Sequence, residues 1–343
     1  MPRSAFYARL FGVGVAVLGG CGDVGVSPWA AQGQLPQDGL FLGCPDFDEE
    51  KALPELANGT TAIAGTNHGS FSVSSVGEAN FSMPIAAPPG RAGMVPGTFV
   101  NYSSASDDGF LGFGFSLGGL GAITRCPKNL AQDGEIEPVR DDASDAFCMD
   151  GARLVEAAPN EYRTIPDSFA KIVASANADG PQSFTVYAKS GLIFEYGGEN
   201  DSRVMARKGV VRSWLLSKQR DRNGNAILYS YKNERDPGDF HTLEFAPERI
   251  DYTDHPDAPA SRAVVFEYGT REPWDVREFF ARGMKLKRSL KLNTIQAYGP
   301  KNSLVREYRI LYTASPNTQR LLLSSIQECA ADQACKPPTQ FSY

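Results

Sequence analysis

From residue 70 onward, polar and apolar residues alternate in short segments that are separated by turn formers. The clearest pair, residues 213–217 and 227–231, flanks the dipeptide Asn223-Gly224. Asn223 and Gly224 favour the positive φ angles of a tight hairpin turn. A period of two is typical of strands with one buried face, whereas an amphipathic helix needs a period near 3.6. The sequence therefore predicts a mainly β protein in which successive antiparallel hairpins form a large curved sheet or shell segment, with few short helices.

The same alternation recurs along the chain, at residues 70–74, 79–85, 98–102, 184–187, 192–196, 249–252, 263–268, 290–298, 304–312 and 321–327. A short helix is expected over residues 274–280. The composition agrees with this interpretation, because 34 Gly, 23 Pro, 20 Phe and 13 Tyr among 343 residues supply many turns and many aromatic strand residues.

A glycine-rich stretch runs from Gly109 to Gly119 and alternates glycine with phenylalanine. It superficially resembles a phosphate-binding loop, but no Lys-Ser/Thr follows it. We expect Gly112 and Gly114 to let strands bend and approach closely. Another structural turn is predicted at Pro88, Pro89 and Gly90.

The first 20 residues have the composition of an export signal. Arg3 and Arg9 precede an apolar run over residues 10–18, which is too short to span a bilayer as a mature helix. Residues 18–21, Leu-Gly-Gly-Cys, resemble a bacterial lipobox, in which Cys21 is lipidated and becomes the new amino terminus. A plain signal peptide cleaved nearby is the alternative.

The resemblance to a lipobox implies an exported protein, either an outer-membrane lipoprotein or an extracellular one. Residues 21–64 are rich in proline and lack sustained periodicity, so we interpret them as a lipid-anchored linker. The remaining residues, 65–343, are predicted to form one β domain.

Five cysteines lie beyond the lipobox, and export permits them to form disulfides. Cys329 and Cys335 flank a short loop and are plausible partners. Cys126 and Cys148 would close a loop of about 20 residues, which contributes on the order of 3 kcal/mol in the chain-entropy model. Cys44 is then free or paired between chains. Neither pair has metal-like spacing with a histidine, so we predict no metal site and no cofactor.

The formal net charge of −6 argues against nucleic-acid binding, because phosphate recognition needs a basic face. Lys and Arg gather over residues 282–291, which we interpret as a solvated strand edge. The acidic pairs Asp107-Asp108 and Asp141-Asp142 are interpreted as turns. Nucleic acid is therefore not an expected partner.

A dense, ordered set of motifs resembles the amino-terminal domain of SpvB-type proteins, which also occurs in Tc-toxin B components and beside Rhs repeats. The motifs occupy residues 69–74, 85–96, 102–104, 109–117, 123–127, 132–134, 147–155, 189–193, 201–203, 221–225, 328–332 and 335–339. The chain departs from the family pattern at Phe115, where Trp is usual, and at Ala146, where Arg is common. Phe can fill an aromatic core position, so neither change threatens the fold.

The resemblance implies a non-catalytic wall segment of a toxin-complex or Rhs-type shell that serves toxin assembly or delivery. In the family, this segment leads into a propeller-like region and Rhs repeats that enclose a toxic cargo. The implied partners are a propeller/Rhs-repeat protein or toxin-complex subunits, together with the membrane through the lipid anchor. This chain ends at Tyr343, which suggests a stand-alone or truncated form.

Two other function classes are weighed against this one. A surface lipoprotein could bind a glycan or a protein through exposed aromatic residues such as Trp274, Tyr268 and Tyr298. An enzyme could act as a hydrolase through Ser116, which lies in a Gly-x-Ser-x-Gly string, or as an ADP-ribosyltransferase through Glu137 of a Glu-x-Glu pair. We favour no enzymatic activity and no catalytic residue, because neither pattern has the strand and helix context that the chemistry needs.

Overall fold

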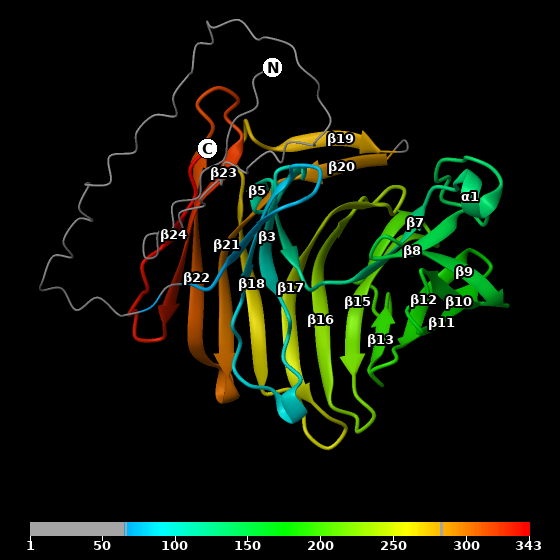
Figure 1. Ribbon diagram of the computed structural model, residues 1–343, viewed down its shortest axis with the longest axis horizontal. Helices are drawn as coiled ribbons and strands as arrows, with labels where there is room; N and C mark the ends of the chain where they lie inside the picture. The colour runs from blue at the N-terminus through cyan, green and yellow to red at the C-terminus, as the bar shows by residue number, and fades with distance from the viewer. Residues whose placement is uncertain (1–64, 66, 282–283) are drawn as a thin grey trace, which may run out of the picture. The chain divides into compact units, whose positions relative to one another are not determined.

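The computed structural model describes residue 65, residues 67–281 and residues 284–343 (Figure 1). The predicted export signal, the linker, Cys21 and Cys44 lie outside this part of the chain. The described part is built almost entirely of antiparallel strands, so the predicted mainly β class is confirmed. Within it, no helix is long and apolar enough to cross a membrane.

Eight strands close into a barrel. They are β7 (Ala122–Cys126), β8 (Ala146–Met149), β9 (Ala152–Ala158), β10 (Glu161–Ile165), β11 (Lys171–Asn177), β12 (Gly180–Tyr187), β13 (Ile193–Tyr196) and β15 (Val210–Arg220). Strands β7 to β13 pair in sequence order, and the ring closes because β15 pairs with both β7 and β13.

Strand β15 also starts a second region, which we call the open sheet (Figure 1). Its free edge pairs with β14 (Arg203–Arg207) and then with the first of seven further strands. These are β16 (Ala226–Arg235), β17 (Thr242–Asp254), β18 (Arg262–Thr270), β21 (Leu290–Gly299), β22 (Ser303–Ala314), β23 (Leu321–Ala330) and β24 (Thr339–Gln340). The predicted strands at 290–298, 304–312 and 321–327 are confirmed as β21, β22 and β23.

A four-stranded sheet lies across the apolar face of the open sheet, as the blue and cyan strands in Figure 1 show. It comprises β1 (Ser70–Val73), β2 (Ala79–Pro84), β3 (Phe99–Ser103) and β6 (Phe115–Gly118), with the short strands β4 (Asp108–Gly109) and β5 (Gly112–Phe113) beside it. We call it the cover sheet. The rings of Phe81 and Phe115 lie 5.5 Å and 4.9 Å from the ring of Phe341, measured between centroids.

In the described residues, helical structure is limited to α1 (Leu130–Asp133) and the 3-10 turns η1 (Arg91–Gly93) and η2 (Pro300–Asn302). The helix predicted over residues 274–280 is wrong. Residues from Arg277 onward form β19 (Arg277–Ala281), which pairs with β20 (Met284–Arg288). The guanidinium of Arg288 lies 4.9 Å from the ring centroid of Phe279, so contacts across the hairpin override the local helix preference.

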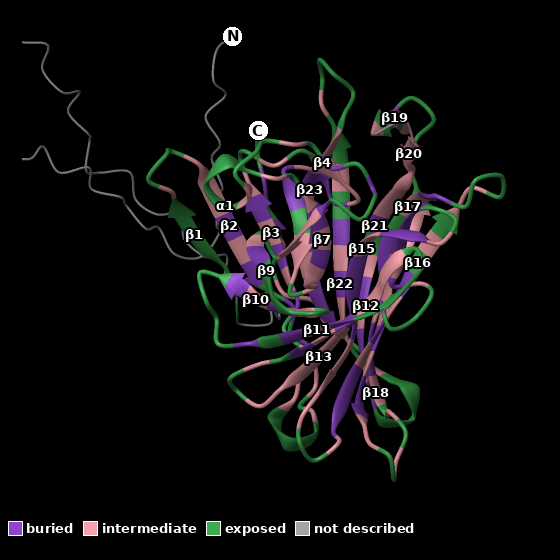
Figure 2. Ribbon diagram, turned by 90° about the vertical axis from the view of Figure 1, so that its right-hand side faces the viewer, coloured by how far each residue is buried: buried purple, intermediate pink, exposed green. Residues whose placement is uncertain are grey.

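Buried residues form one connected apolar core along the inward faces of the strands, seen as alternating bands in Figure 2. Inside the barrel, Phe147, Tyr162, Phe184 and Trp214 pack edge to face, with ring centroids 4.9–6.0 Å apart. Trp214 and Phe184 are fully buried. Burial of a large aromatic side chain contributes on the order of 3 kcal/mol, so this cluster is a principal source of barrel stability.

Candidate functional site

One disulfide joins neighbouring strands at an end of the barrel. Cys126 in β7 bonds to Cys148 in β8, and their Cα atoms are 5.9 Å apart. Because Cys126 lies opposite Ala146, the bond runs diagonally across the two strands. It encloses the loop that carries α1, where Asp133 forms an ion pair with Arg153 of β9. The predicted pair therefore fixes this loop to the barrel rim.

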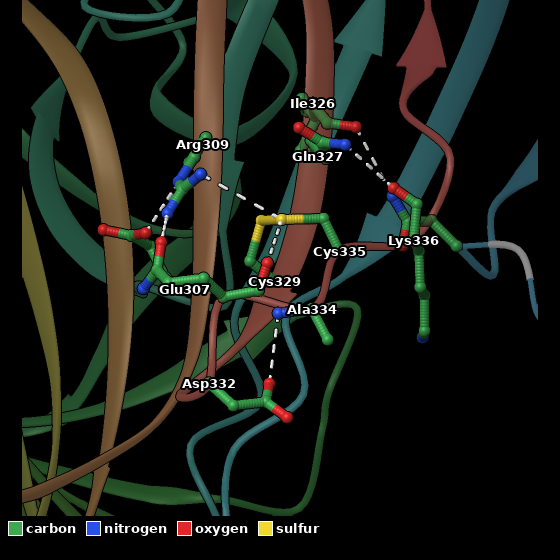
Figure 3. The surroundings of a disulfide bond; sticks show 11 residues. Glu307, Arg309, Ile326, Gln327, Cys329, Asp332, Ala334, Cys335 and Lys336 are labelled. Atoms are coloured by element: carbon green, nitrogen blue, oxygen red, sulfur yellow. Dashed lines mark hydrogen bonds and ion pairs between the residues drawn. A yellow bond between two sulfur atoms is a disulfide. The ribbon is translucent and has the colours of Figure 1, made fainter. Parts of the chain in front are cut away.

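The second disulfide closes a chain reversal in the open sheet (Figure 3). Cys329 at the end of β23 bonds to Cys335, six residues later, and the two residues also form an antiparallel bridge. Beside them, the Arg309 guanidinium lies 4.0 Å from Cys335 Sγ and 2.8 Å from a carboxylate oxygen of Glu307. Gln327 Nε2 donates a 3.0 Å hydrogen bond to the Lys336 carbonyl. These contacts turn the chain back along β23.

The returning segment joins the open sheet to the cover sheet. Strand β24 pairs with β23 through Thr339 and Gln340, and the backbone N–H of Phe341 donates to the Ser324 carbonyl at 2.9 Å. Phe341 is 6% exposed and contacts both Phe81 and Phe115. Phe115 is itself 1% exposed, so phenylalanine fills the core position where the family usually has tryptophan.

The predicted glycine bends coincide with close backbone approaches. Gly112 has φ +83°, and a Cβ there would lie 2.7 Å from the Leu321 carbonyl oxygen. At Gly90, a Cβ would lie 1.6 Å from the Met94 carbonyl oxygen, so the η1 turn has no room for a side chain. The hydroxyl of Tyr252 donates a 2.8 Å hydrogen bond to the Pro88 carbonyl, which attaches this turn to the open sheet.

The turn at Asn223-Gly224 differs in detail from its prediction. Only Gly224 has a positive φ, +89°, whereas the sequence favoured positive angles at both positions. The Asp221 carboxylate accepts hydrogen bonds from the backbone N–H groups of Asn223 and Asn225 at 2.8 and 3.0 Å. This side-chain capping creates a three-residue loop in which glycine alone needs the left-handed conformation.

Two buried arginines, which the sequence did not single out, hold loops onto the sheets. In the barrel, Arg125 is 5% exposed and pairs with Asp145 at 3.2 Å. Its Nε donates to the Val211 carbonyl at 2.8 Å, and its guanidinium lies 5.7 Å from the Trp214 ring centroid. A charged residue at an inward strand position, where alternation calls for an apolar one, was the available signal.

In the open sheet, the side chain of Arg271 is completely buried. Two of its nitrogens bind the two carboxylate oxygens of Asp108 at 2.8 and 3.0 Å, and a third contact at 3.1 Å reaches Asp275. Asp108, interpreted from the sequence as a turn residue, thus carries a bidentate ion pair with a residue 163 positions away. Asp141, likewise interpreted as a turn residue, pairs with Arg212 at 2.8 Å.

The candidate catalytic residues do not form a reactive cluster. Ser116 is exposed in the middle of β6, opposite Asn101, and the next element is a strand, so a nucleophile elbow is missing at this position. Glu137 binds Arg140 at 2.8 Å, and both Glu137 and Glu135 lie within 3.7 Å of Lys128 Nζ. The hydrogen bond that Lys128 donates to Glu135 raises the pKa of Lys128.

The three aromatic residues considered for ligand binding lie apart. Tyr298 and Tyr268 lie near opposite ends of the paired strands β18 and β21, because Ala263 pairs with Tyr298 and Tyr268 pairs with Leu292. Tyr268 donates its hydroxyl hydrogen to the Pro247 carbonyl at 2.8 Å, and burial raises its pKa. Trp274 alone is largely exposed, at 62%.

Strand β1 forms an exposed edge of the cover sheet. Every residue of β1 is exposed, including Phe71 at 53% and Val73 at 61%, and among the described strands β1 pairs only with β2. An exposed edge strand with apolar side chains offers unpaired backbone groups to another chain. We therefore regard β1 as the candidate interaction site.

Comparison with known families gives one match, to SpvB, the Salmonella virulence plasmid 65 kDa B protein, over residues 73–308. The chain belongs to the SpvB family. The amino-terminal domain of the effector SpvB from Salmonella typhimurium strain LT2 is 17% identical, with a TM-score of 0.58, and the match covers 72% of this chain and 99% of that domain. No curated protein matches the chain.

Toxin-complex structures share the fold as well. The crystal structure of TcdB2-TccC3 is 18% identical with a TM-score of 0.64, and the match covers 81% of this chain. A Tc holotoxin pore from Photorhabdus luminescens gives the same identity and TM-score over 87% of this chain. In both cases this chain spans 17% of the longer one. The chain is thus a member of the SpvB family, and its fold is shared with one segment of these toxin-complex structures.

Proposed function

We propose that this protein is a non-catalytic structural module of a toxin-complex or Rhs-type shell, used in toxin assembly or delivery. The observation that carries the proposal is the family match over residues 73–308, joined to a fold that forms one segment of a much longer toxin-complex chain. The matched region makes up 17% of the TcdB2-TccC3 chain. A module of that relative size supports a role as one wall segment of a larger shell.

The arrangement of polar side chains supports this role. On the open sheet, polar side chains bind one another across and along strands: Gln296 Nε2 in β21 donates to Glu307 in β22 at 3.1 Å, and Arg309, also in β22, binds the same carboxylate. Glu135 and Glu137 are held in ion pairs with Lys128 and Arg140, and Ser116 stands in a strand with no adjacent base among the described contacts. Such a surface favours a scaffold over a reactive centre.

We further propose that the protein is exported and tethered to the envelope through Cys21. Two disulfides within the domain support export, because disulfides persist in oxidising compartments. Metabolic labelling with a fatty acid tests the anchor. The wild-type chain should incorporate the label, and Cys21→Ser should not. Equal incorporation would remove the anchor from the proposal and leave the shell role intact.

The shell role is tested by co-expression with propeller and Rhs-repeat proteins encoded in the same genome. We expect a stable complex by size-exclusion chromatography, and we expect Phe71→Lys with Val73→Lys in β1 to weaken it at least tenfold. Val155→Lys, at an exposed barrel position, is the matched control. Absence of a complex with every such protein would contradict the proposal.

A second candidate function, surface binding of a glycan or a protein, has one observation in its favour. Trp274 is 62% exposed and lines a shallow depression with Tyr312 and Lys291. A glycan array with the wild-type protein and Trp274→Ala tests it, and Tyr298→Ala serves as the control at another partly exposed aromatic. Binding that is lost only in Trp274→Ala would favour this function.

A further inference from the structure

The β19–β20 hairpin lies outside the open sheet and crosses one end of it (Figure 1). The Glu244 carboxylate of β17 attaches the end of the hairpin, because it accepts hydrogen bonds from the N–H groups of Ser289 and Leu290 at 2.7 and 3.1 Å. Beside this attachment, residues of the hairpin, of β17 and of neighbouring strands line a cavity of about 410 Å³. Its volume falls in the range of about 300–1,000 Å³ that is typical of small-molecule sites.

The walls of this cavity are mainly apolar and come from distant parts of the chain. They include Phe110, Val204, Leu243, Phe245, Phe279 and Leu286. Phe279 and Leu286 pair directly across the hairpin, so their side chains project from the same face of it. Phe245 remains 43% exposed. Apolar side chains left open around a depression favour binding of an apolar group.

The two carboxylates in the lining are already matched by donors within the protein. Both oxygens of Glu244 accept hydrogen bonds, because the Ser289 hydroxyl donates to the second oxygen at 2.5 Å. Asp108 is bound at both oxygens by the buried Arg271. An anionic ligand therefore meets no uncompensated carboxylate among the residues that line the cavity.

Arg288 of β20 is the cation that stands at the apolar wall. Its guanidinium lies 4.9 Å from the ring centroid of Phe279. Its carboxylate partner, Asp107, is 3.6 Å away with a side chain that is 76% exposed. Such an exposed ion pair contributes little to stability, so a ligand anion can replace Asp107 at small cost. The planar guanidinium suits a carboxylate, which it can bind through two parallel hydrogen bonds.

The other two cations in the lining are engaged elsewhere. Arg212 binds Asp141 at 2.8 Å. Lys287 follows Leu286 in β20, so its side chain projects from the opposite face of the hairpin, where it lies 3.3 Å from Glu234. The cavity thus combines an apolar depression with one exchangeable positive group.

We propose that this cavity binds a monoanionic amphiphile of the free fatty acid class, with the acyl chain among the apolar walls and the carboxylate on the Arg288 guanidinium. A neutral apolar ligand would leave the guanidinium unused, and a polyanion would find only one exchangeable cation. Because the walls belong to both the hairpin and β17, the bound chain would hold these two elements together. This inference is independent of the shell role and of the anchor at Cys21.

The test is calorimetric titration of the delipidated full chain with dodecanoate, dodecanol and dodecyltrimethylammonium, which share one chain length and differ in charge. We expect one dodecanoate per chain, a raised unfolding temperature, and weaker binding of the other two ligands. Arg288→Gln should weaken dodecanoate at least about tenfold and leave dodecanol unchanged, because only the carboxylate loses its charged donor. Phe245→Ser should weaken both ligands.

Each variant has a matched control in the same hairpin. Arg277 pairs with Arg288 across the two strands but lies outside the cavity lining, so Arg277→Gln should bind dodecanoate like wild type. Phe280 is 73% exposed and follows Phe279 in β19, so it projects from the opposite face, and Phe280→Ser should also bind like wild type.

The proposal is overturned if wild type binds no dodecanoate, if it binds dodecyltrimethylammonium as tightly, or if Arg277→Gln loses the same affinity as Arg288→Gln. Tighter binding of a short peptide that ends in phenylalanine would assign the cavity to a protein segment and would also overturn it. Circular dichroism checks that each variant folds. If Arg288→Gln does not fold, the comparison of the three ligands on wild type decides the role of charge, and Phe245→Ser decides the place of binding.

Discussion

The barrel and the open sheet protect their strand edges in different ways. In the barrel, β15 pairs with both β7 and β13, so each strand of the ring has a neighbour on either side. The open sheet instead ends at β24, a strand of two residues. Its apolar face is covered by strands from the beginning of the described chain, and its last strand is held by a disulfide-closed reversal.

The two cores reflect this difference. The barrel core is supplied by the barrel strands themselves, with Phe147, Phe184 and Trp214 in mutual contact. The core under the cover sheet depends on residues from distant parts of the chain, such as Phe81 and Phe341. The closed barrel buries its core with its own strands. The open sheet depends on segments from distant parts of the chain, and each of these segments can detach separately.

The largest expected effect comes from removing one aromatic ring from each region. Trp214→Ala should lower the free energy of unfolding by about 4 kcal/mol and Phe341→Ala by about 3 kcal/mol, through lost burial and a new cavity. Hydrogen exchange should then rise in both regions for Trp214→Ala, because β15 belongs to both. For Phe341→Ala, it should rise only in β23, β24 and the cover sheet. Increased exchange in β9–β12 of Phe341→Ala would contradict the comparison.

The disulfides offer the next test. In the chain-entropy model, Cys126→Ser/Cys148→Ser should cost about 3 kcal/mol of unfolding free energy, and Cys329→Ser/Cys335→Ser about 2 kcal/mol, because the second loop is shorter. Urea unfolding of the two double variants measures both costs. If removal of Cys329–Cys335 cost more than removal of Cys126–Cys148, the short disulfide would restrain more than its own loop. That result would indicate that it holds the last strand of the open sheet in place.

Alkaline pH should weaken the open sheet through Tyr252. Burial raises the pKa of Tyr252 from 10.0 to about 12, and the nearby Arg262 partly opposes this. The folded state therefore keeps a proton that the unfolded chain loses. This contribution to stability is complete below pH 10 and lost between pH 10 and 12, by about 1 kcal/mol at pH 11.

Urea unfolding at pH 9 and pH 11 measures this effect. Other buried tyrosines titrate in the same range, so the informative quantity is the difference between wild type and Tyr252→Phe. The variant should lose less stability than wild type over this interval. An identical loss in both proteins would exclude Tyr252 as a source.

The smallest effect is expected at Trp274. Trp274→Ala should change the free energy of unfolding by no more than about 0.5 kcal/mol, because the side chain is 62% exposed. Urea unfolding of Trp274→Ala and Trp214→Ala in parallel compares the loss of an exposed tryptophan with the loss of a buried one. A loss above 2 kcal/mol would mean that Trp274 packs against the sheet in solution.

The local features of this fold could be predicted from the sequence, because a period of two and turn residues are properties of short segments. Strands β21, β22 and β23 lie where alternation placed them, and Gly112 lies at a close backbone approach. The helix expected near Trp274 failed because Phe279 and Phe280 pair across a hairpin, a contact that their own neighbours in sequence do not reveal.

Long-range closure could not be predicted. The β13–β15 pairing that completes the barrel and the contact of Asp108 with Arg271 both join positions that carry no mutual signal in one sequence.

The double membership of β15 limits how the chain can be divided. Its residues pair with β7 and β13 on one edge and with β14 and β16 on the other. A cut just before residues 210–220 would leave the barrel without its closing strand. A cut just after them would leave the open sheet without its first strand. Exchange of either half between relatives would have to carry this strand along, so recombination breakpoints are expected outside it.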